Sequence, residues 1–529
     1  MALFIRVPGI TWGLPNELHN QSYHPDEQVI WVFSQGIEPA HLKFTPGVYN
    51  YGTLYLTLLR VASDVVAGYG GGPKANDPES VWRYIGACHL AGRWISALAG
   101  SGAVVFVFFM LRRLTNEFGA ALGAMLLAVA AAFVVHSRFQ TVDVLATFFL
   151  AGSLWFALRV LDDERPDKMA LLAGVFAGLS AGTKYTGVLA LLALVAALAL
   201  RDKPFRWKAL ASGVGACFGV FLLTTPGALL ESDKFLRDFR YEMLHTSTGH
   251  GLVFEDVGNG FLYHLTNLFQ SLGPIALIMA VVGLGMAAWQ RQRWAGVLLA
   301  FFVPYYFLIG RAEVLFIRYT FPLLVVLAVA FGWLAGSSHD KGGKNRLVAA
   351  LAVLATGLTL IITLGFTSPM MGSDYRDILA KDLKANAKPE TTVGLVSDPW
   401  FYTPPLIPDS AIMRGQNKLQ WQEMAESSGP HVVQYIPEDP RTRFDWDKRL
   451  LTEIKPDFVV FSSFEVADVS RLSKSGKHYP EVDHFLEFQA ELEKGYQQVS
   501  GADGYRTAGY MVHDLKYVRP IYWVWKRKP

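Results

Sequence analysis

The amino-acid sequence predicts a polytopic α-helical membrane protein that ends in a soluble α/β domain. Of its 529 residues, 52% are hydrophobic and 18% are charged, and the mean hydropathy is +0.26. The apolar residues come in blocks of about 17 to 25, the length that crosses a hydrocarbon core of ~30 Å. These blocks stop near residue 370, and the rest of the chain mixes polar, helix-like stretches with short β-rich runs.

The membrane spans are predicted from the apolar blocks. Ten are recognisable, at about 90–111, 118–135, 144–161, 169–183, 186–200, 209–225, 262–289, 295–310, 317–335 and 346–366. A shorter apolar run, Met1 to Leu14, precedes them, and we interpret it as a short or truncated first span, which makes about eleven transmembrane helices. The predicted domains are a transmembrane module over 1–369 with a large first loop (15–89), and a soluble α/β domain over 370–529.

The orientation follows from the basic residues, because Lys and Arg resist translocation. The connections near 111–117, 159–168, 201–208, 290–294 and 339–346 hold fourteen Lys and Arg, whereas the intervening connections hold seven. The first set is therefore predicted to face the cytoplasm. This alternation predicts that the first loop and the C-terminal domain lie outside. We expect the membrane to be the cytoplasmic membrane of a bacterium or archaeon.

Charge and cysteine content exclude two other classes of protein. The balance of 48 Lys+Arg against 45 Asp+Glu gives a net charge of +3, which is far from the dense basicity of a nucleic-acid binder. The two cysteines, Cys88 and Cys217, suggest neither a disulfide framework nor a thiolate metal site.

The first loop is too long to be a passive connection, and loops of that length are usually functional or carry structure. It begins with Tyr23-His-Pro-Asp-Glu27, and the pattern after it predicts a short helix along the membrane surface, with Pro25 at its start. A second helix is predicted over Leu54 to Val66, with Arg60 and Asp64 as an i,i+4 ion pair.

Asp26 is the first candidate for a functional role, although it is equally suited to cap the surface helix, since acids favour the first turn. The functional hypothesis rests on other charges at the predicted outer ends of spans, where ionisable groups are usually paired or functional. These charges are His136, Arg138, Asp143, Lys184 and Arg318. Carboxylates and cations at one interface suit a reaction in which an acid group takes a proton while cations hold a phosphate.

Four segments together resemble a known group of enzymes. Tyr23-His-Pro-Asp-Glu27, Ser137-Arg138-Phe139 with Asp143, Gly182-Thr-Lys-Tyr-Thr-Gly187 and Arg318-Tyr-Thr-Phe-Pro322 are similar to motifs of the protein O-mannosyltransferase and aminoarabinose transferase group of GT-C glycosyltransferases. The resemblance covers about 1–366. It departs from the group at Asn50-Tyr-Gly-Thr-Leu54, where many relatives carry Tyr-Pro-Pro, and in the short first span.

The resemblance implies transfer of a sugar from a polyprenyl-phosphate donor to an acceptor hydroxyl on the outer face of the membrane, with inversion. The acceptor would be a protein, a glycolipid or a polysaccharide. Asp26 would be the general base, and Glu27 would orient the acceptor or the surface helix. The donor phosphate would be bound by Arg318, Lys184 and Arg138, with Tyr319 and Tyr185 beside them. Asp143, His24 and His136 would contact the acceptor or support the site.

Other interpretations stay open. Arg318 and Lys184 at span ends also suit snorkelling to the interface, and Asp143 also suits a helix cap or a pair with Arg138. The histidines allow a divalent metal hypothesis, although the group implies no metal or other cofactor. As a whole, the chain is also compatible with a transporter or flippase of a lipid-linked or anionic substrate, or with a scaffold or sensor.

Two further predictions concern loops and strands. The outer stretch 226–261 is either a solvated loop or a segment that closes over the lipid or the acceptor. In the tail, strands are predicted at Thr392–Val396 and Phe458–Phe461, and a final strand at Tyr517–Trp525, where Pro520 indicates an edge position.

Overall fold

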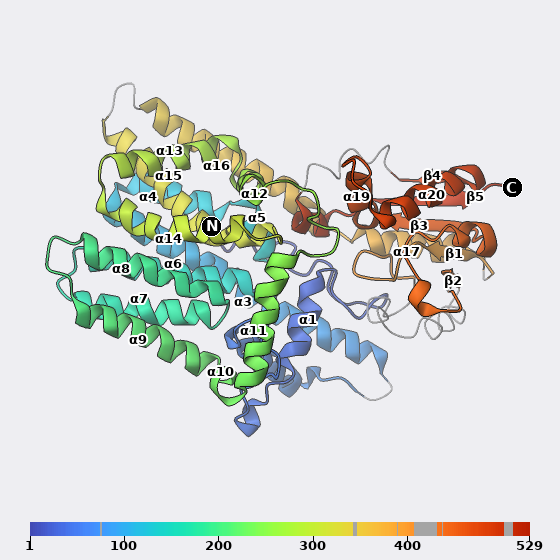
Figure 1. The fold of residues 1–529 in the computed structure, drawn as a ribbon, viewed down its shortest axis with the longest axis horizontal. Helices are drawn as coiled ribbons and strands as arrows, with labels where there is room; N and C mark the ends of the chain where they lie inside the picture. The colour runs from blue at the N-terminus through green and yellow to red at the C-terminus, as the bar shows by residue number, and fades with distance from the viewer. Residues whose placement is uncertain (75–76, 342–345, 389, 407–430, 436, 502–511) are drawn as a thin grey trace.

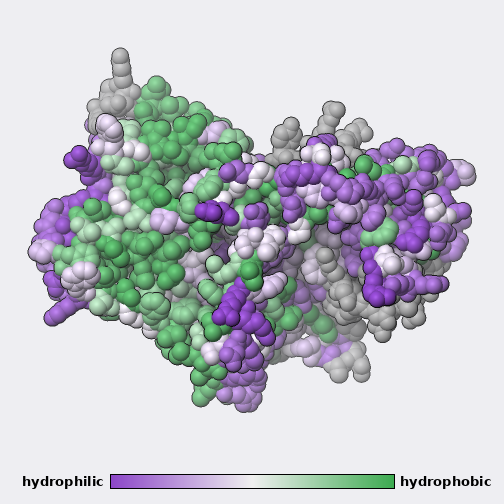
Figure 2. All heavy atoms as spheres, viewed as in Figure 1, coloured by the Kyte–Doolittle hydropathy of each residue, from purple (hydrophilic) through white to green (hydrophobic). Residues whose placement is uncertain are grey.

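The computed structural model describes residues 1–529 apart from 75–76, 342–345, 389, 407–430, 436 and 502–511. The protein has two parts, a bundle of apolar helices and a smaller part built around a β-sheet, with the first loop and α11 (Ser232–Thr248) beside their junction (Figure 1). In the view shown, the surface of the bundle is largely hydrophobic, whereas the sheet part is largely hydrophilic (Figure 2).

The helical bundle contains each of the ten recognisable spans as a helix or as a pair of helices. Within the described residues, six helices are long and apolar enough to cross a membrane, and a bent pair would make a seventh. The helices of the bundle are α3 (Pro78–Leu114), α4 (Glu117–Ala128), α5 (Ala131–His136), α6 (Val142–Val160), α7 (Pro166–Ala181), α8 (Leu191–Leu200), α9 (Trp207–Thr224), α12 (Gly260–Leu272), α13 (Pro274–Trp289), α14 (Arg293–Gly310), α15 (Phe321–Lys341) and α16 (Arg346–Thr367).

The predicted span at 262–289 is not one straight helix. It consists of α12 and α13, which are bent by 113° at a break. The break lies at Gly273, whose φ is +76°, a backbone conformation that residues with a side chain rarely adopt. Pro274 then begins α13, because its fixed φ suits the first position of a helix.

The apolar run Met1 to Leu14 does not form the predicted helix. It folds as a series of turns, with Gly9 and Gly13 at positive φ. Arg6, in the middle of the run, is fully buried and donates to the carbonyl oxygen of Ala128 (3.0 Å) and to the hydroxyl of Ser137 (3.1 Å). The segment therefore packs into the bundle through a buried polar side chain, which the apolar pattern did not indicate.

The first loop contains both predicted helices. They are α1 (Pro25–Ser34), with Pro25 at its first position, and α2 (Leu54–Val66), which carries the Arg60–Asp64 ion pair at 2.9 Å. Between them the chain packs against the end of α7. A Cβ on Gly52 would come within 2.1 Å of the carbonyl oxygen of Gly182, and the N–H of Leu54 donates to that oxygen. The loop is thus held close to Lys184.

The chain beyond α16 contains a five-stranded mixed sheet in the order β2-β1-β3-β5-β4. The strands are β1 (Thr392–Leu395), β2 (His431–Val433), β3 (Phe458–Ser462), β4 (Tyr496–Ser500) and β5 (Tyr522–Arg527). The helices are α17 (Tyr375–Asn386), α19 (Ser463–Leu472) and α20 (Pro480–Gly495). β1 is parallel to β2 and β3, whereas β5 is antiparallel to both of its neighbours.

The final strand differs from its prediction in length and in position. β5 begins at Tyr522, after Pro520, so the proline lies outside the sheet and does not force the strand to an edge. β5 instead lies between β3 and β4. The residues before it, His513–Val518, form a short 3₁₀-helix that packs against the turn Ile317–Thr320, which precedes α15.

Candidate active site

A cavity of about 480 Å³ lies where the first loop, the ends of several bundle helices and the sheet part meet. The predicted site residues that line it are Asp26, Asp143, Lys184, Tyr185, Arg318 and Tyr319. Glu242, His245 and His250 line it from the stretch 226–261, and Trp400, Phe401, His513 and Tyr517 line it from the C-terminal part. Side chains that are hundreds of residues apart in the sequence thus share one space.

Arg318 lies at the centre of the charged side chains. It belongs to a 3₁₀-turn, Ile317–Thr320, that leads into α15, and its side chain is 8% exposed. Its Nη2 is 3.2 Å from the carboxylate of Asp26, its Nε is 3.8 Å from that of Asp143 and its Nη1 is 3.5 Å from that of Asp514. The guanidinium plane also lies 3.8 Å from the ring centre of Phe316, a cation–π contact.

Lys184 supplies the second cation of the cavity. Its Nζ is 2.5 Å from the carboxylate of Asp143 and 4.3 Å from the ring centre of Tyr319. Asp143 lies in the first turn of α6 and pairs with Lys184 and Arg318. The alternative that Asp143 pairs with Arg138 is therefore wrong.

Asp26 reaches the cavity from the first turn of α1. The cap of this helix is His24, whose Nδ1 accepts a hydrogen bond from the Asp26 N–H at 3.3 Å, so the Asp26 carboxylate does not act as the cap. That carboxylate is 27% exposed. Burial opposes its ionisation, but the charges of Arg318, His24, His250 and Lys184 outweigh burial and lower the pKa of Asp26. Asp26 is therefore ionised at neutral pH.

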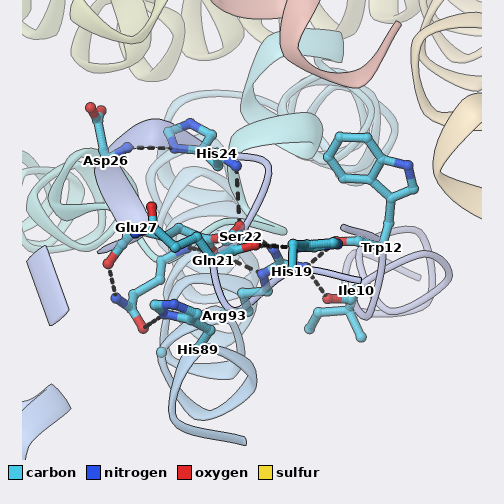
Figure 3. A network of polar contacts seen from close by, with 12 residues as sticks. Ile10, Trp12, His19, Gln21, Ser22, His24, Asp26, Glu27, His89 and Arg93 are labelled. Carbon is cyan, nitrogen blue, oxygen red and sulfur yellow. Dashed lines mark hydrogen bonds and ion pairs between the residues drawn. The ribbon is translucent and has the colours of Figure 1, made fainter. Parts of the chain in front are cut away.

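Glu27 does not line the cavity and belongs to a buried polar network (Figure 3). It is fully buried and forms a bidentate pair with Arg93, at 2.8 and 2.7 Å. The hydroxyl of Ser22 and the backbone N–H of Gln140 also donate to it. Burial raises the pKa of Glu27, but Arg93 more than compensates and the pKa falls to about 2. Direct catalysis by Glu27 is thus excluded by its position, whereas orientation of the surface helix is compatible with it.

Three further predicted site residues lie outside the cavity lining. Arg138 is buried and donates to the carbonyl oxygen of Ile5 at 2.7 Å, so it anchors the N-terminal turns and does not face a phosphate site. His24 and His136 are both fully buried, with ring centres 6.0 Å apart. The Nε2 of His136 is 3.7 Å from the carboxylate of Asp514. These two histidines can support the site but do not contact an acceptor in the cavity.

The two predicted tyrosines have different surroundings. Tyr185 donates to the carbonyl oxygens of Tyr49 (2.7 Å) and Tyr51 (2.9 Å), and so holds the first loop at the rim of the cavity. Tyr319 offers its ring to Lys184, and its carbonyl oxygen accepts a hydrogen bond from Tyr305 at 3.0 Å.

The largest omission of the sequence analysis is the contribution of the C-terminal part. Asp514 is fully buried and accepts hydrogen bonds from the N–H groups of Ile317 (3.0 Å) and Arg318 (3.4 Å). Burial raises its pKa, although Arg318 and these backbone donors oppose the rise. No motif marks Asp514, because it lies in an unremarkable polar stretch and meets Arg318 only through the tertiary fold.

The outer stretch 226–261 forms part of the cavity wall. It contains α10 (Gly227–Leu230) and α11, whose Glu242 accepts a hydrogen bond from Asn50 at 2.7 Å. His245 and His250 follow, with their ring nitrogens 3.3 Å apart. Within the described residues, no group of three or more His, Cys, Asp or Glu is arranged to hold a metal ion.

Comparison with known proteins supports the resemblance found in the sequence. A family model described as dolichyl-phosphate-mannose-protein mannosyltransferase matches residues 82–226. The match confirms the resemblance to protein mannosyltransferases over this segment. The mannosyltransferase-like segment includes Asp143 and Lys184 of the cavity, whereas Asp26 and Arg318 lie outside it.

Solved structures also match this chain, each at a TM-score below 0.5. ArnT from Cupriavidus metallidurans in the apo state is 14% identical, with a TM-score of 0.49 over 89% of this chain and 92% of that chain. The same protein bound to undecaprenyl phosphate is 15% identical, with a TM-score of 0.48 over 99% and 96%. The archaeal oligosaccharyltransferase AglB from Archaeoglobus fulgidus is 13% identical, with a TM-score of 0.45 over 87% and 69%. No curated protein sequence matches the chain.

Proposed function

We propose that this protein is a membrane glycosyltransferase that moves a sugar from a polyprenyl-phosphate donor to an acceptor hydroxyl at the outer face of the membrane. The observation that carries the proposal is the cavity in which an ionised carboxylate, Asp26, lies beside the two cations Arg318 and Lys184. The mannosyltransferase-like segment supports the donor class, because its family description names a lipid-phosphate-linked sugar.

In the proposed reaction, Asp26 is the general base. The acceptor oxygen attacks the anomeric carbon while its proton passes to the Asp26 carboxylate. A base within hydrogen-bond reach of that proton typically contributes ~10² to 10⁴ in rate. Because a single displacement enters from the face opposite the leaving group, the configuration at the anomeric carbon inverts.

The leaving group explains the need for cations. As the bond between the anomeric carbon and the phosphate oxygen breaks, its electron pair stays on the lipid phosphate, and negative charge grows there. Fixed cations stabilise that charge more in the transition state than in the ground state. Arg318 offers a guanidinium fork and Lys184 a point charge. Both lie in the cavity, whereas Arg138 does not, so we leave Arg138 out of the proposed donor site.

The test is a transfer assay with purified protein and a panel of polyprenyl-phosphate sugars. We expect Asp26→Asn to lower turnover by ~10² to 10⁴ while donor binding persists. Glu242→Gln is the matched control, because it neutralises another carboxylate of the same cavity that does not contact Arg318. Full turnover by Asp26→Asn would remove the base assignment. Absence of donor binding and transfer by the wild-type protein with every donor would overturn the proposed function itself.

A further inference from the structure

Arg318 has a different carboxylate partner at each of its three nitrogens. Asp26 faces Nη2, Asp143 faces Nε and Asp514 faces Nη1, all at 3.2 to 3.8 Å. A guanidinium binds phosphate through the same N–H groups that it offers to carboxylates. A donor phosphate that binds an edge of the Arg318 guanidinium in this cavity uses N–H groups that a carboxylate already faces, so it competes with at least one of the three.

Two of the three carboxylates are fixed by other partners. Asp143 is held by Lys184 at 2.5 Å and is 6% exposed. Asp514 is held by two backbone N–H groups and is 1% exposed. Removing either from Arg318 would leave a buried charge with strained or lost contacts, which is strongly unfavourable.

Asp26 differs from both in exposure and in partners. Its carboxylate is 27% exposed and lies on the cavity wall. Within the described part of the chain, Arg318 is the only ion-pair partner of that carboxylate, at 3.2 Å. Asp26 is thus the partner that a ligand in the cavity can replace most easily.

Building on the proposed function, we propose that the donor phosphate and Asp26 compete for the Nη2 edge of Arg318, while Asp514 and Asp143 hold the other two nitrogens in place. Before the donor binds, Asp26 occupies this edge. Binding of the donor releases the Asp26 carboxylate toward the cavity, where the acceptor hydroxyl arrives. Asp514, from the C-terminal part, is then a positioning residue that fixes the direction of the guanidinium.

The exchange links donor binding to the strength of the base. Burial alone would raise the pKa of Asp26, and among the neighbouring charges Arg318 does most to lower it. When phosphate takes over the guanidinium, that influence is partly cancelled and the pKa of Asp26 rises. A carboxylate with a higher pKa accepts a proton more readily. The base is therefore weak before the donor binds and becomes effective afterwards.

The first experiment measures binding of polyprenyl phosphate to the full-length protein in detergent or nanodiscs. Loss of the competing charge in Asp26→Asn should tighten binding by about tenfold, the equivalent of one modest ion pair. A base that only contacts the acceptor would leave this affinity unchanged.

Two carboxylate variants separate competition from a general loss of negative charge. Asp514→Asn keeps an oxygen that can accept from the Ile317 N–H, and Glu242→Gln neutralises a carboxylate elsewhere in the cavity. We expect either variant to tighten binding by less than a third of the gain in Asp26→Asn. Equal gains in all three variants, or no gain in Asp26→Asn, would overturn the inference while leaving the transferase proposal intact. No binding of polyprenyl phosphate by the wild type would overturn both.

A second measurement uses only the wild-type protein, so it does not depend on how a variant folds. The acid limb of kcat/KM for the donor reports the free enzyme, and that of kcat reports the complex. We expect the acid limb of kcat to lie at higher pH than the acid limb of kcat/KM, because Asp26 no longer pairs with Arg318 in the complex. The other titratable or charged groups around Asp26 are Lys184, His24, His250, Tyr51, Tyr319 and Tyr517. A kcat limb at the same or lower pH would contradict the exchange.

Discussion

Two ion-pair clusters begin at adjacent residues of the first loop and differ in almost every physical respect. Glu27 is fully buried, and its carboxylate is saturated by Arg93, Ser22 and Gln140. Asp26 is partly exposed, shares Arg318 with two other carboxylates and faces a cavity. Residue type and sequence position do not separate the two acids, whereas burial and the number of partners do.

The difference shows which cluster is suited to chemistry. A buried charge with every lone pair satisfied is locked in place, and exchanging its partners is strongly unfavourable. A charge that shares its partner and borders open space can exchange that partner for a ligand. We therefore regard the Glu27 cluster as the anchor that holds α1, and the Asp26 cluster as the reactive site that the anchor positions.

The comparison predicts its largest effect on stability at Glu27. Glu27→Ala leaves Arg93 buried without its charge partner, and breaking such a pair typically lowers the free energy of unfolding by ~3–5 kcal/mol. Asp26→Ala should have a clearly smaller effect, because Arg318 keeps Asp143 and Asp514. Thermal or denaturant unfolding in detergent measures both. Equal destabilisation by the two variants would mean that the clusters do not differ as we describe.

The same anchor predicts a pH dependence of stability. The pKa of Glu27 is about 2 in the folded protein, against an ordinary value of 4.5. Because the folded pKa is depressed, the stabilisation is fully present above pH 4.5 and is lost as the pH falls toward 2. A shift of this size corresponds to about 3 kcal/mol. The free energy of unfolding of the wild type, measured between pH 4.5 and 2, should fall accordingly. In Glu27→Gln the part of this fall that comes from Glu27 should be absent.

The sequence predicted the helical bundle better than its details. Long apolar blocks correspond to helices because hydrophobicity over a full span decides the structure locally. The bend was missed although its causes are local, a glycine at positive φ followed by Pro274. The turns around Arg6 were missed because they depend on contacts with a distant segment. For example, Arg6 is buried against Ala128 and Ser137, which no local pattern encodes.

The candidate site was predictable where charges lie at the ends of apolar blocks, as for Asp143, Lys184 and Arg318, and at Asp26 through the acidic start of a helix in the long first loop. The fold brings these four residues into one cavity. Arg138 also lies at the end of an apolar block, but its side chain binds the N-terminal turns instead of lining the cavity. Asp514 carries no signal at all, since it comes from a polar segment far along the chain. Convergence of distant segments therefore limits what a single sequence reveals.

The contrast extends to two arginines of the predicted phosphate site. Arg318→Lys keeps the charge but loses the guanidinium fork, so we expect donor affinity to fall about tenfold, the value of one charge-assisted hydrogen bond. Arg138→Lys should leave donor affinity within about twofold, because Arg138 does not line the cavity. Equilibrium binding of polyprenyl phosphate measures both variants. An equal loss in Arg138→Lys would return that residue to the donor site.

The smallest effect is expected at an ion pair on the surface of the same loop. Arg60 and Asp64 pair at 2.9 Å across one turn of α2, but their side chains are 23% and 45% exposed. Water and salt screen such a pair, so Asp64→Asn should lower the free energy of unfolding by less than ~0.5 kcal/mol. Arg60 also donates to Gln35 at 2.9 Å, a contact that the substitution leaves in place. A loss as large as that of Glu27→Ala would show that burial does not set the value of these pairs, and would remove the basis on which we separate anchor from reactive site.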